Sequence, residues 1–465
     1  MTAAQNFSPA APQELEPPPL LKVSFVCFCI FLLANYSRLF EWHFAEAHVP
    51  LITAIIALMG AAMEGRLAAV FGSRIGMCMT ILTVLYTVNI PLSTWRRGSV
   101  EEYAGWLKTV LAFAIAGAII FNLRQCRTAL NSIGWATGIA GLLVNWQGAS
   151  IGGRLSFGRG SFGNSNAIAF GLLIGLPFLI LILQDSGSWK LKRLLALCAI
   201  ASNLLVILRT GSRGGLIGLI ALCLFLFLRS SMTAKLAMMV VGGLAIAAAF
   251  TVLPRDLKLR YQTILSGSEA TSDVQNSTDA LAVGYAESSS AARRQLLINS
   301  LKVTLSHPLF GVGIGQFGGY MAGIDEAAGR HSGWQGTHNT YTQISSEAGI
   351  PALIAFVCLV IFSIQGVRAL SRRAQKIPGA REPAKGIIDM AFALTATLLV
   401  YAVCICFDYI AYGDTMPILA GFTIALIRCG NSELDRLERA PVPESQGAFL
   451  NLYAMRPARA MRPAI

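Results

Sequence analysis

The sequence predicts an all-α polytopic membrane protein. Of its 465 residues, 54% are hydrophobic and only 13% are charged, and apolar runs long enough to cross a bilayer recur along the chain. Because lipid offers no partners to an open backbone, these runs are expected to be helical. The formal net charge of +13 fits helix orientation and contact with anionic membrane lipids, so we expect no nucleic-acid partner.

About twelve transmembrane helices are expected, nine before a long polar insertion and three after it. The expected spans are residues 21–36, 48–63, 75–91, 104–121, 129–146, 166–184, 193–209, 214–229, 236–253, 350–367, 386–406 and 414–428. The resulting divisions are a disordered cytoplasmic N-terminal tail (1–20), a first helical block (21–253), a large insertion (254–349), a second helical block (350–428) and a cytoplasmic C-terminal tail (429–465).

Basic residues predict the orientation of these helices. With a cytoplasmic N-terminus, the inner connections carry many of the Lys and Arg residues, such as Arg66 and Arg74 after the second span and Arg368 and Arg372 after the tenth. Both termini are therefore expected in the cytoplasm. The main segments placed on the outer side are 92–103, 147–165, 209–213 and 254–349.

Several arginines nevertheless lie on the outer side, where the positive-inside rule disfavours them. They are Arg96, Arg97, Arg154, Arg159, Arg209, Arg213, Arg293 and Arg294. A single arginine near a helix end commonly snorkels to the interface or pairs with a carboxylate. Carboxylates are scarce in 147–165 and 205–215, so the cluster predicts an anionic ligand at the outer surface.

The long insertion has distinct parts. Residues 267–290 are rich in Ser, Ala, Asp and Thr and predict a mobile segment. Residues 291–305 have leucines at helical spacing, and His307-Pro308 predicts the end of that helix. The GxGxxG at 313–318 lacks the βαβ unit of a dinucleotide fold, so its glycines instead predict a tight turn that brings the backbone close to the membrane or a ligand.

The stretch GTHNTYTQISSEAGIP, residues 336–351, places His338 just before an apolar span. A lone histidine at a helix entry is more often structural, but a neutral imidazole is also suited to accept a proton near pH 7. Glu347 fits two roles, orienting His338 or capping the local structure. Trp95 likewise fits an interfacial anchor or, with the neighbouring arginines, a contact to phosphates.

Four motifs together resemble one family. ARRQLLINSLKVTLSHPLFGVGIGQF (292–317) and THNTYTQISSEAGIP (337–351) resemble the C-terminal signature of the O-antigen ligase and polymerase superfamily of bacterial envelope enzymes. GRLSFGRGSFGNSNAIA (153–169) is similar to that family's external loop, and RTGSRGG (209–215) to its Ser-Arg-Gly element. The motifs stand in the family's order, all on the predicted outer side.

The resemblance implies a GT-C-like transferase of lipopolysaccharide biosynthesis in the bacterial inner membrane, with a periplasmic active site. Its donor would be a glycan linked through diphosphate to undecaprenol, and in the ligases the acceptor is the lipid A core oligosaccharide. Matching the motifs implies roles in activity for Arg213, for Arg293 or its neighbour Arg294, and for His338. Further substrate contacts are expected from Arg154, Arg159, Asn166, Asn339 and Tyr341. Ser165 stands where relatives commonly carry proline, which leaves the geometry of that turn open.

The chemistry of the residues fits this role. Cleavage of a glycosyl-diphosphate bond releases an anionic leaving group, which either a divalent metal or fixed cations can stabilise. The outer segments contain no DxD motif, so we expect arginines to do this, with no metal and no cofactor. His338 is the predicted base for the acceptor hydroxyl, and displacement in one step predicts inversion.

Other functions stay open at this point. A polymerase or a protein O-oligosaccharyltransferase would use the same donor with a different acceptor, and the motif-bearing insertion favours the ligase. A lipid or glycolipid transporter would place polar residues near the bilayer midplane on interrupted helices. Here the unusual polar groups gather at one face, which favours surface chemistry.

Overall fold

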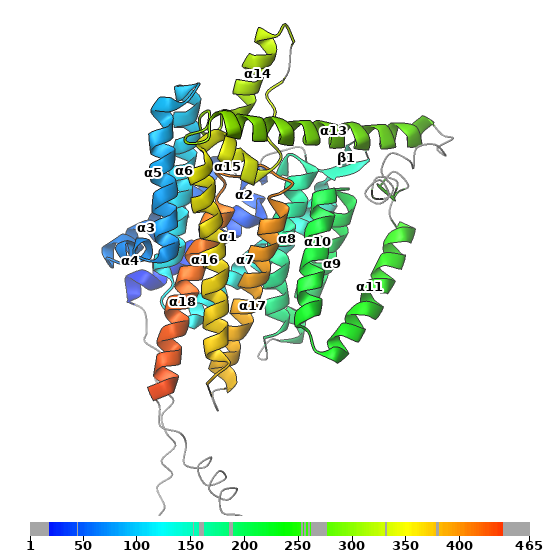
Figure 1. Ribbon diagram of the computed structural model, residues 1–465. Coiled ribbons are helices and arrows are strands. Elements are labelled where there is room, and N and C mark those ends of the chain that lie inside the picture. The colour runs from blue at the N-terminus through cyan, green and yellow to red at the C-terminus, as the bar shows by residue number, and fades with distance from the viewer. Residues whose placement is uncertain are drawn as a thin grey trace, which may run out of the picture.

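The protein is a bundle of long helices whose motif-bearing segments gather at one end (Figure 1). The computed structural model describes residues 18–439 apart from 44, 152, 158–161, 186–188, 253, 255–256, 259–260, 262–276, 331–332 and 378–380. The predicted tails therefore lie largely outside the described residues. Residues 429–439 of the predicted C-terminal tail are helical, because the last described helix continues to Arg439.

Each of the twelve predicted spans falls on a long helix. These helices are α1 (Pro19–Ser37), α3 (Val49–Met63), α5 (Arg74–Leu92), α6 (Arg96–Ile119), α7 (Leu123–Gln147), α8 (Ser165–Leu183), α9 (Lys190–Arg209), α10 (Arg213–Arg229), α11 (Met232–Val252), α16 (Ile350–Ala374), α17 (Arg381–Cys404) and α18 (Thr415–Arg439). Short elements, namely α2 (Leu39–His43), the 3-10 turn η1 (Ala45–Ala47) and α4 (Leu67–Phe71), join the first of them.

Six helices in the described part of the chain are long and apolar enough to cross a membrane by length and composition: α1, α5, α8, α9, α16 and α17. The apolar stretches of α3 and of Met232–Leu244 in α11 are shorter. The chain is thus an integral membrane protein built of helices. Crossing by all twelve long helices stays a prediction.

Small residues let the central helices approach closely. A Cβ atom added to Gly175 of α8 would overlap the Thr137 side chain of α7, and one added to Gly134 would press on the backbone of α8. Close contact through Gly, Ala and Thr is how helices pack where lipid removes the hydrophobic driving force. This packing fixes α8, whose first residue, Ser165, ends the loop of residues 147–165.

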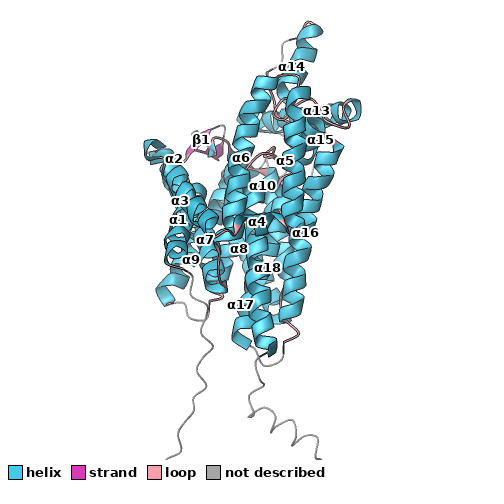
Figure 2. Cartoon of the chain, turned by 90° about the vertical axis from the view of Figure 1, so that its left-hand side faces the viewer, coloured by secondary structure: helices cyan, strands magenta, loops and turns pink. Residues whose placement is uncertain are grey.

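The long insertion and a small hairpin cover one end of the bundle. In Figures 1 and 2, α13 (Ser277–Ser306) lies across that end, with α15 (Thr340–Ala348) beneath it and α14 (Phe317–Ala327) projecting beyond. Strands β1 (Ala149–Ile151) and β2 (Arg154–Ser156) form an antiparallel hairpin there, which the all-helical prediction did not include. Helices α16 and α18 end at the opposite end (Figure 1).

The structure corrects the predicted mobile segment of residues 267–290. Helix α13 begins at Ser277, so residues 277–290 are helical, while 267–276 lie outside the described residues. Ser, Thr and Asp suggested a loop because their side chains compete for backbone hydrogen bonds. The alanines of this stretch favour a helix and continue it without a break into the predicted segment.

Candidate functional site

His338 stands in a short turn whose two flanks are fixed. Its φ of 52° lies in the left-handed region, which costs a non-glycine residue about 1–3 kcal/mol. Thr337 Oγ1 donates to the carbonyl of Asn339 at 2.9 Å. The Asn339 side chain in turn caps α15 by accepting from the N–H of Thr342 at 3.1 Å. These contacts hold the histidine in a backbone conformation that it would not choose alone.

The connection between α17 and α18, residues 405–414, docks onto the start of α15. The N–H of Thr340 donates to the carbonyl of Ile405 at 2.8 Å. Thr340 Oγ1 donates to the carbonyl of Asp408 at 2.9 Å and accepts from the N–H of Ile410 at 3.1 Å. One threonine therefore fixes this connection beside His338.

An acidic residue enters the site from this connection. The Asp408 side chain is buried at 7% exposure; its Oδ1 accepts from the N–H of Tyr409, and its Oδ2 has no hydrogen-bond partner among the described residues. Burial raises the pKa of Asp408, while the Tyr409 hydrogen bond and the charge of Arg293 act to lower it. We did not predict Asp408 from the sequence; an acidic residue in a short outer connection was the available signal.

A cavity of about 310 Å³ brings His338 and Arg293 together. Trp334, Gly336 and Tyr409 also line it, and the ring of Tyr409 meets the imidazole edge-on with centroids 4.9 Å apart. A Cβ atom at Gly336 would overlap the Tyr409 ring, so the cavity wall depends on glycine there. The cavity opens at the end of the bundle that α13 covers.

The structure distinguishes the tandem arginines of α13. Arg293 is half-buried and lines the His338 cavity, whereas Arg294 is exposed and does not line it. Adjacent residues point to different sides of a helix, so only one of the pair can face α15. Arg293 is the one that does so.

The cations of the site act on each other. Burial lowers the pKa of Arg293, as does the positive charge of Arg213, while Asp408 acts to raise it. Burial is also the main cause that lowers the pKa of His338, with a smaller effect from Arg293. Both causes favour the neutral imidazole over the protonated one.

His338 Nδ1 is itself buried without a hydrogen-bond partner in the described part of the chain. A buried polar atom left in this state has a cost that a bound ligand can remove. The same holds for Asp408 Oδ2.

Arg154 and Asn166 hold the start of α10. Arg154 donates from Nε to the carbonyl of Thr210 at 2.8 Å and from Nη2 to Asn166 Oδ1 at 3.0 Å. Ser212 Oγ donates to the same Asn166 oxygen at 2.8 Å. These bonds join β2, α8 and the α9–α10 junction, so two of the predicted substrate contacts position Arg213, the first residue of α10.

The loop before α8 has an unstrained cap despite the missing proline. Asn164 Oδ1 accepts from the N–H groups of Asn166 and Ala167 at 2.9 and 2.8 Å. Ser165 is the first residue of α8, the position at which proline is favoured because its φ suits the helix. Serine adopts the same conformation here. Arg159, earlier in this loop, lies outside the described residues.

The other two predicted substrate contacts face the protein. The Tyr341 hydroxyl donates to the carbonyl of Ala402 at 3.0 Å, and its ring meets Phe356 edge-on with centroids 6.2 Å apart. Asn339 caps α15 and donates from Nδ2 to the carbonyl of Cys406 at 3.2 Å. Their geometry supports roles in holding α15 against its neighbours.

Glu347 holds the glycine-rich loop. Its carboxylate accepts from the Tyr412 hydroxyl at 2.7 Å and from the N–H groups of Gly315 and Phe317 at 3.1 and 3.2 Å. Burial raises its pKa to about 7. Of the two roles open from the sequence, these bonds favour local anchoring. Gly311 has φ 64° and lies against the Glu347 backbone, so the predicted tight turn brings backbone close to protein.

Two more cavities meet the first at the 405–414 connection. One, of about 470 Å³, shares Trp334 and Tyr409 with the His338 cavity and adds Glu102 and Gln343. The other, of about 680 Å³, is mainly apolar and lies between α1, α3, α6 and α8, with Asp408 on its wall. The apolar cavity shares Ile410 and Gly413 with the cavity of about 470 Å³, which in turn shares Trp334 and Tyr409 with the His338 cavity.

Among the described residues, no group of three or more His, Cys, Asp or Glu side chains could bind a metal ion. At the His338 cavity, the guanidinium of Arg293 supplies positive charge to an anion.

Comparison with known proteins agrees with the motifs. A family model described as O-antigen ligase matches residues 194–357, which include Arg213, Arg293 and His338. The resemblance found in the sequence is thereby confirmed. A search of curated proteins finds no match to this chain.

Proposed function

We propose that the chain is an O-antigen ligase that transfers a glycan from undecaprenyl diphosphate to the lipid A core. The observation that carries the proposal is the meeting of Arg293 and His338 at one cavity, with both residues inside the segment that matches the family. All-helical construction, a polar site at one end and a lateral apolar cavity agree with a GT-C-like enzyme that works at the periplasmic face of the inner membrane.

The apolar cavity suits the lipid of the donor. Its walls come from α1, α3, α6 and α8, and side chains such as Leu51, Ile55 and Phe170 line it. Arg38 and Lys108 lie among the same residues, where they can meet a phosphate at the edge of the bilayer. A polyprenyl chain would lie between the helices, with its diphosphate toward Asp408 and the two arginines.

The arginines would stabilise the leaving group. When the bond between the anomeric carbon and the diphosphate oxygen breaks, the electron pair stays on that oxygen, and negative charge develops there. The positive charge of Arg213 acts on Arg293, so an anion bound near both would be favoured by both guanidinium groups. This arrangement needs no metal.

His338 would take the proton of the acceptor hydroxyl. Its lowered pKa keeps it neutral, and general base catalysis contributes roughly 10²–10⁴-fold. The acceptor oxygen forms the new bond to the anomeric carbon on the face opposite the departing diphosphate, which inverts the configuration. Asp408, a buried carboxyl near Arg293, would offset part of the positive charge that develops when the imidazole is protonated.

The acceptor sugars would lie in the cavity of about 470 Å³. Trp334 is 65% exposed and meets Trp95 edge-on with centroids 5.6 Å apart, which offers aromatic faces to sugar rings. Glu102, Gln335 and Gln343 line the same cavity and can accept or donate hydrogen bonds to hydroxyls.

The test uses full-length protein in lipid nanodiscs, with an undecaprenyl-diphosphate glycan and purified lipid A core. We expect the wild type to transfer the glycan whether or not a chelator is present. We expect His338→Ala to lose transfer while it still binds the donor. His307→Ala is the matched control, because His307 bonds to Ser306, meets the Tyr320 ring edge-on and does not line the cavity.

Each other outcome has a definite meaning. Unchanged transfer in His338→Ala removes the base assignment, and activity that needs magnesium removes the arginine scheme. Extension of the glycan on its own lipid carrier, without use of lipid A core, would identify a polymerase. Retention at the anomeric carbon by NMR would contradict the single displacement.

A further inference from the structure

Two basic cavities lie at the end of the bundle opposite His338, and they share Arg372. The larger, of about 710 Å³, lies between α5, α16 and α18 and is lined by Arg74, Arg372 and Arg428. The smaller, of about 380 Å³, lies between α10, α16 and α17 and is lined by Arg229, Arg368 and Arg372. Arg74 begins α5 and Arg229 ends α10, which places both cavities at one level of the bundle.

The larger cavity has two chemically different walls. Side chains of Ile75, Phe362, Ile424 and Ile427 form an apolar wall beside the three arginines. Arg428 is fixed by a bond from Nη2 to the carbonyl of Ile120 at 2.6 Å, which leaves its charge at the cavity. A ligand that fits must present both an anion and a hydrocarbon chain.

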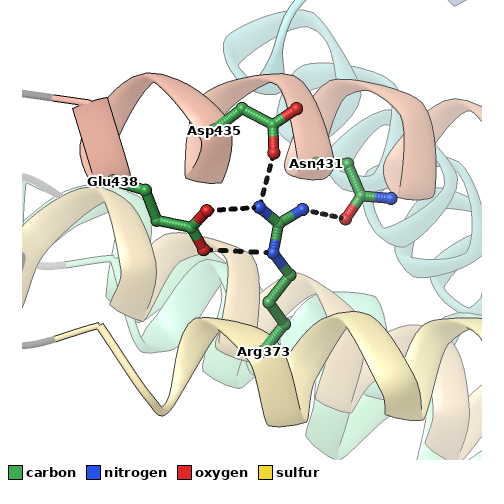
Figure 3. Close-up of polar contacts among 4 residues, drawn as sticks. All are labelled: Arg373, Asn431, Asp435 and Glu438. Carbon is green, nitrogen blue, oxygen red and sulfur yellow. Dashed lines mark hydrogen bonds and ion pairs between the residues drawn. The ribbon is translucent and has the colours of Figure 1, made fainter.

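No acidic residue stands among the described residues that line either cavity. Arg373, the next residue along α16, does have acidic partners. Figure 3 shows Arg373 held by Asp435, Glu438 and Asn431 of α18, with Nη2 2.8 Å from Glu438 Oε2 and Nη1 2.9 Å from Asn431 Oδ1. Carboxylates on α18 thus neutralise Arg373 and leave the lining of the two cavities basic.

We propose that these cavities bind the phosphate headgroups of anionic phospholipids from the cytoplasmic leaflet, with Arg372 shared between two headgroup positions. Arginine clusters between membrane helices on the cytoplasmic side match phosphate in charge and in hydrogen-bond geometry. The apolar wall accommodates the first part of an acyl chain. The site is independent of the transferase reaction and lies at the other end of the helices.

The occupant is a lipid rather than a soluble anion because the apolar wall adds area that only a hydrocarbon chain can cover. Phosphatidylglycerol supplies one phosphate and two acyl chains, and phosphatidylcholine supplies the same phosphate without net charge. These two lipids therefore separate charge recognition from simple solvation by the bilayer.

The test measures lipid binding to full-length protein by native mass spectrometry after delipidation. We expect phosphatidylglycerol to bind in preference to phosphatidylcholine, and binding to weaken about fivefold in Arg372→Gln, as expected for loss of one basic contact. Arg74→Gln should weaken it by a similar factor. Arg373→Gln is the matched control, since its charge is already satisfied, and it should bind as the wild type does.

Several results would overturn the proposal. They are equal binding of the two lipids, an Arg372→Gln protein that binds like wild type, or displacement of the lipid by inorganic phosphate at millimolar concentration, which would indicate a soluble-anion site. Arg368→Gln gives a second variant on the smaller cavity in case Arg372→Gln does not fold. Transferase activity reports on the opposite end, so failure here would leave the proposed function untouched.

Discussion

Two arginines at opposite ends of the bundle show different ways of keeping a charge. Arg373 on α16 faces Asp435 and Glu438 of α18 and donates hydrogen bonds to both carboxylates (Figure 3). Arg293 on α13 is half-buried, lines a cavity and has its pKa lowered by burial and by Arg213. The Arg373 guanidinium has carboxylate partners within the protein, whereas burial and Arg213 disfavour the charged form of Arg293.

The difference teaches how to tell a structural arginine from a ligand-binding one in this protein. Arg373 joins α16 to α18, and its ion pairs are made within the protein. Burial and the charge of Arg213 both disfavour the charged form of Arg293, while Asp408 favours it. An ionisable group whose pKa is shifted in this way is a candidate for contact with a bound anion.

The largest expected effect comes from removing the cavity arginine. Arg293→Ala should reduce transfer by about 10²–10³-fold, because fixed charge at a developing anion contributes that much to a rate. Its neighbour on the exposed side of α13 is the control, and Arg294→Ala should retain most activity. Single-turnover rates with a saturating lipid-linked donor would measure both. Equal loss in the two variants would contradict the assignment of Arg293.

The second prediction concerns the acceptor. Trp334→Ala should raise the KM for lipid A core about tenfold with little change in kcat, because an exposed aromatic face holds the acceptor without touching the reacting atoms. Initial rates over a range of acceptor concentrations would measure it. Trp189, which is 82% exposed and precedes α9 at the end of the bundle opposite His338, is the control. A fall in kcat with unchanged KM would move Trp334 out of the acceptor site.

The sequence predicted the helices and the outline of the site because both depend on local patterns. Apolar runs located the twelve long helices, and the His-Asn and Ser-Arg-Gly motifs located His338 and Arg213. The periodicity of residues 291–305 located the helix that carries Arg293 but not its start at Ser277, since alanine-rich and serine-rich stretches give no apolar period.

Contacts between distant segments decided what the sequence could not. Asp408 reaches the site through bonds to Thr340, which is 68 residues away in the chain, and no local pattern encodes that distance. Arg154 has the residue type of a ligand contact, yet it donates hydrogen bonds to Thr210 and Asn166. Whether an arginine meets ligand or protein depends on neighbours that only the fold brings together.

The third prediction concerns the effect of Arg293 on the pKa of His338. Arg293→Gln removes a positive charge near His338, so the protonated imidazole becomes less unfavourable and the pKa of His338 should rise toward its ordinary value. The acid limb of the pH profile for residual transfer should shift to higher pH with it. Histidine NMR signals followed against pH would measure the shift directly. Arg294→Gln should leave it unchanged, and a fall in the pKa would contradict the arrangement.

The smallest effect is expected at the satisfied arginine. Arg373→Ala removes ion pairs between α16 and α18 that lie in a water-accessible position, where such pairs contribute little to stability. The Tm should fall slightly, and less at high salt, because salt already screens these charges in the wild type. Circular dichroism on the protein in nanodiscs would follow the transition at low and high salt, with transfer measured beside it.

Transfer should stay at the wild-type rate in Arg373→Ala, since the residue lies at the end of α16 and His338 precedes the start of that helix. Asp435→Asn tests the same contact from α18 and should reproduce the small fall in Tm. A large loss of transfer in either variant would mean that the α16–α18 contact controls the outer site. The two arginines would then be coupled through α16, and the distinction between a structural and a ligand-binding charge would fail in this protein.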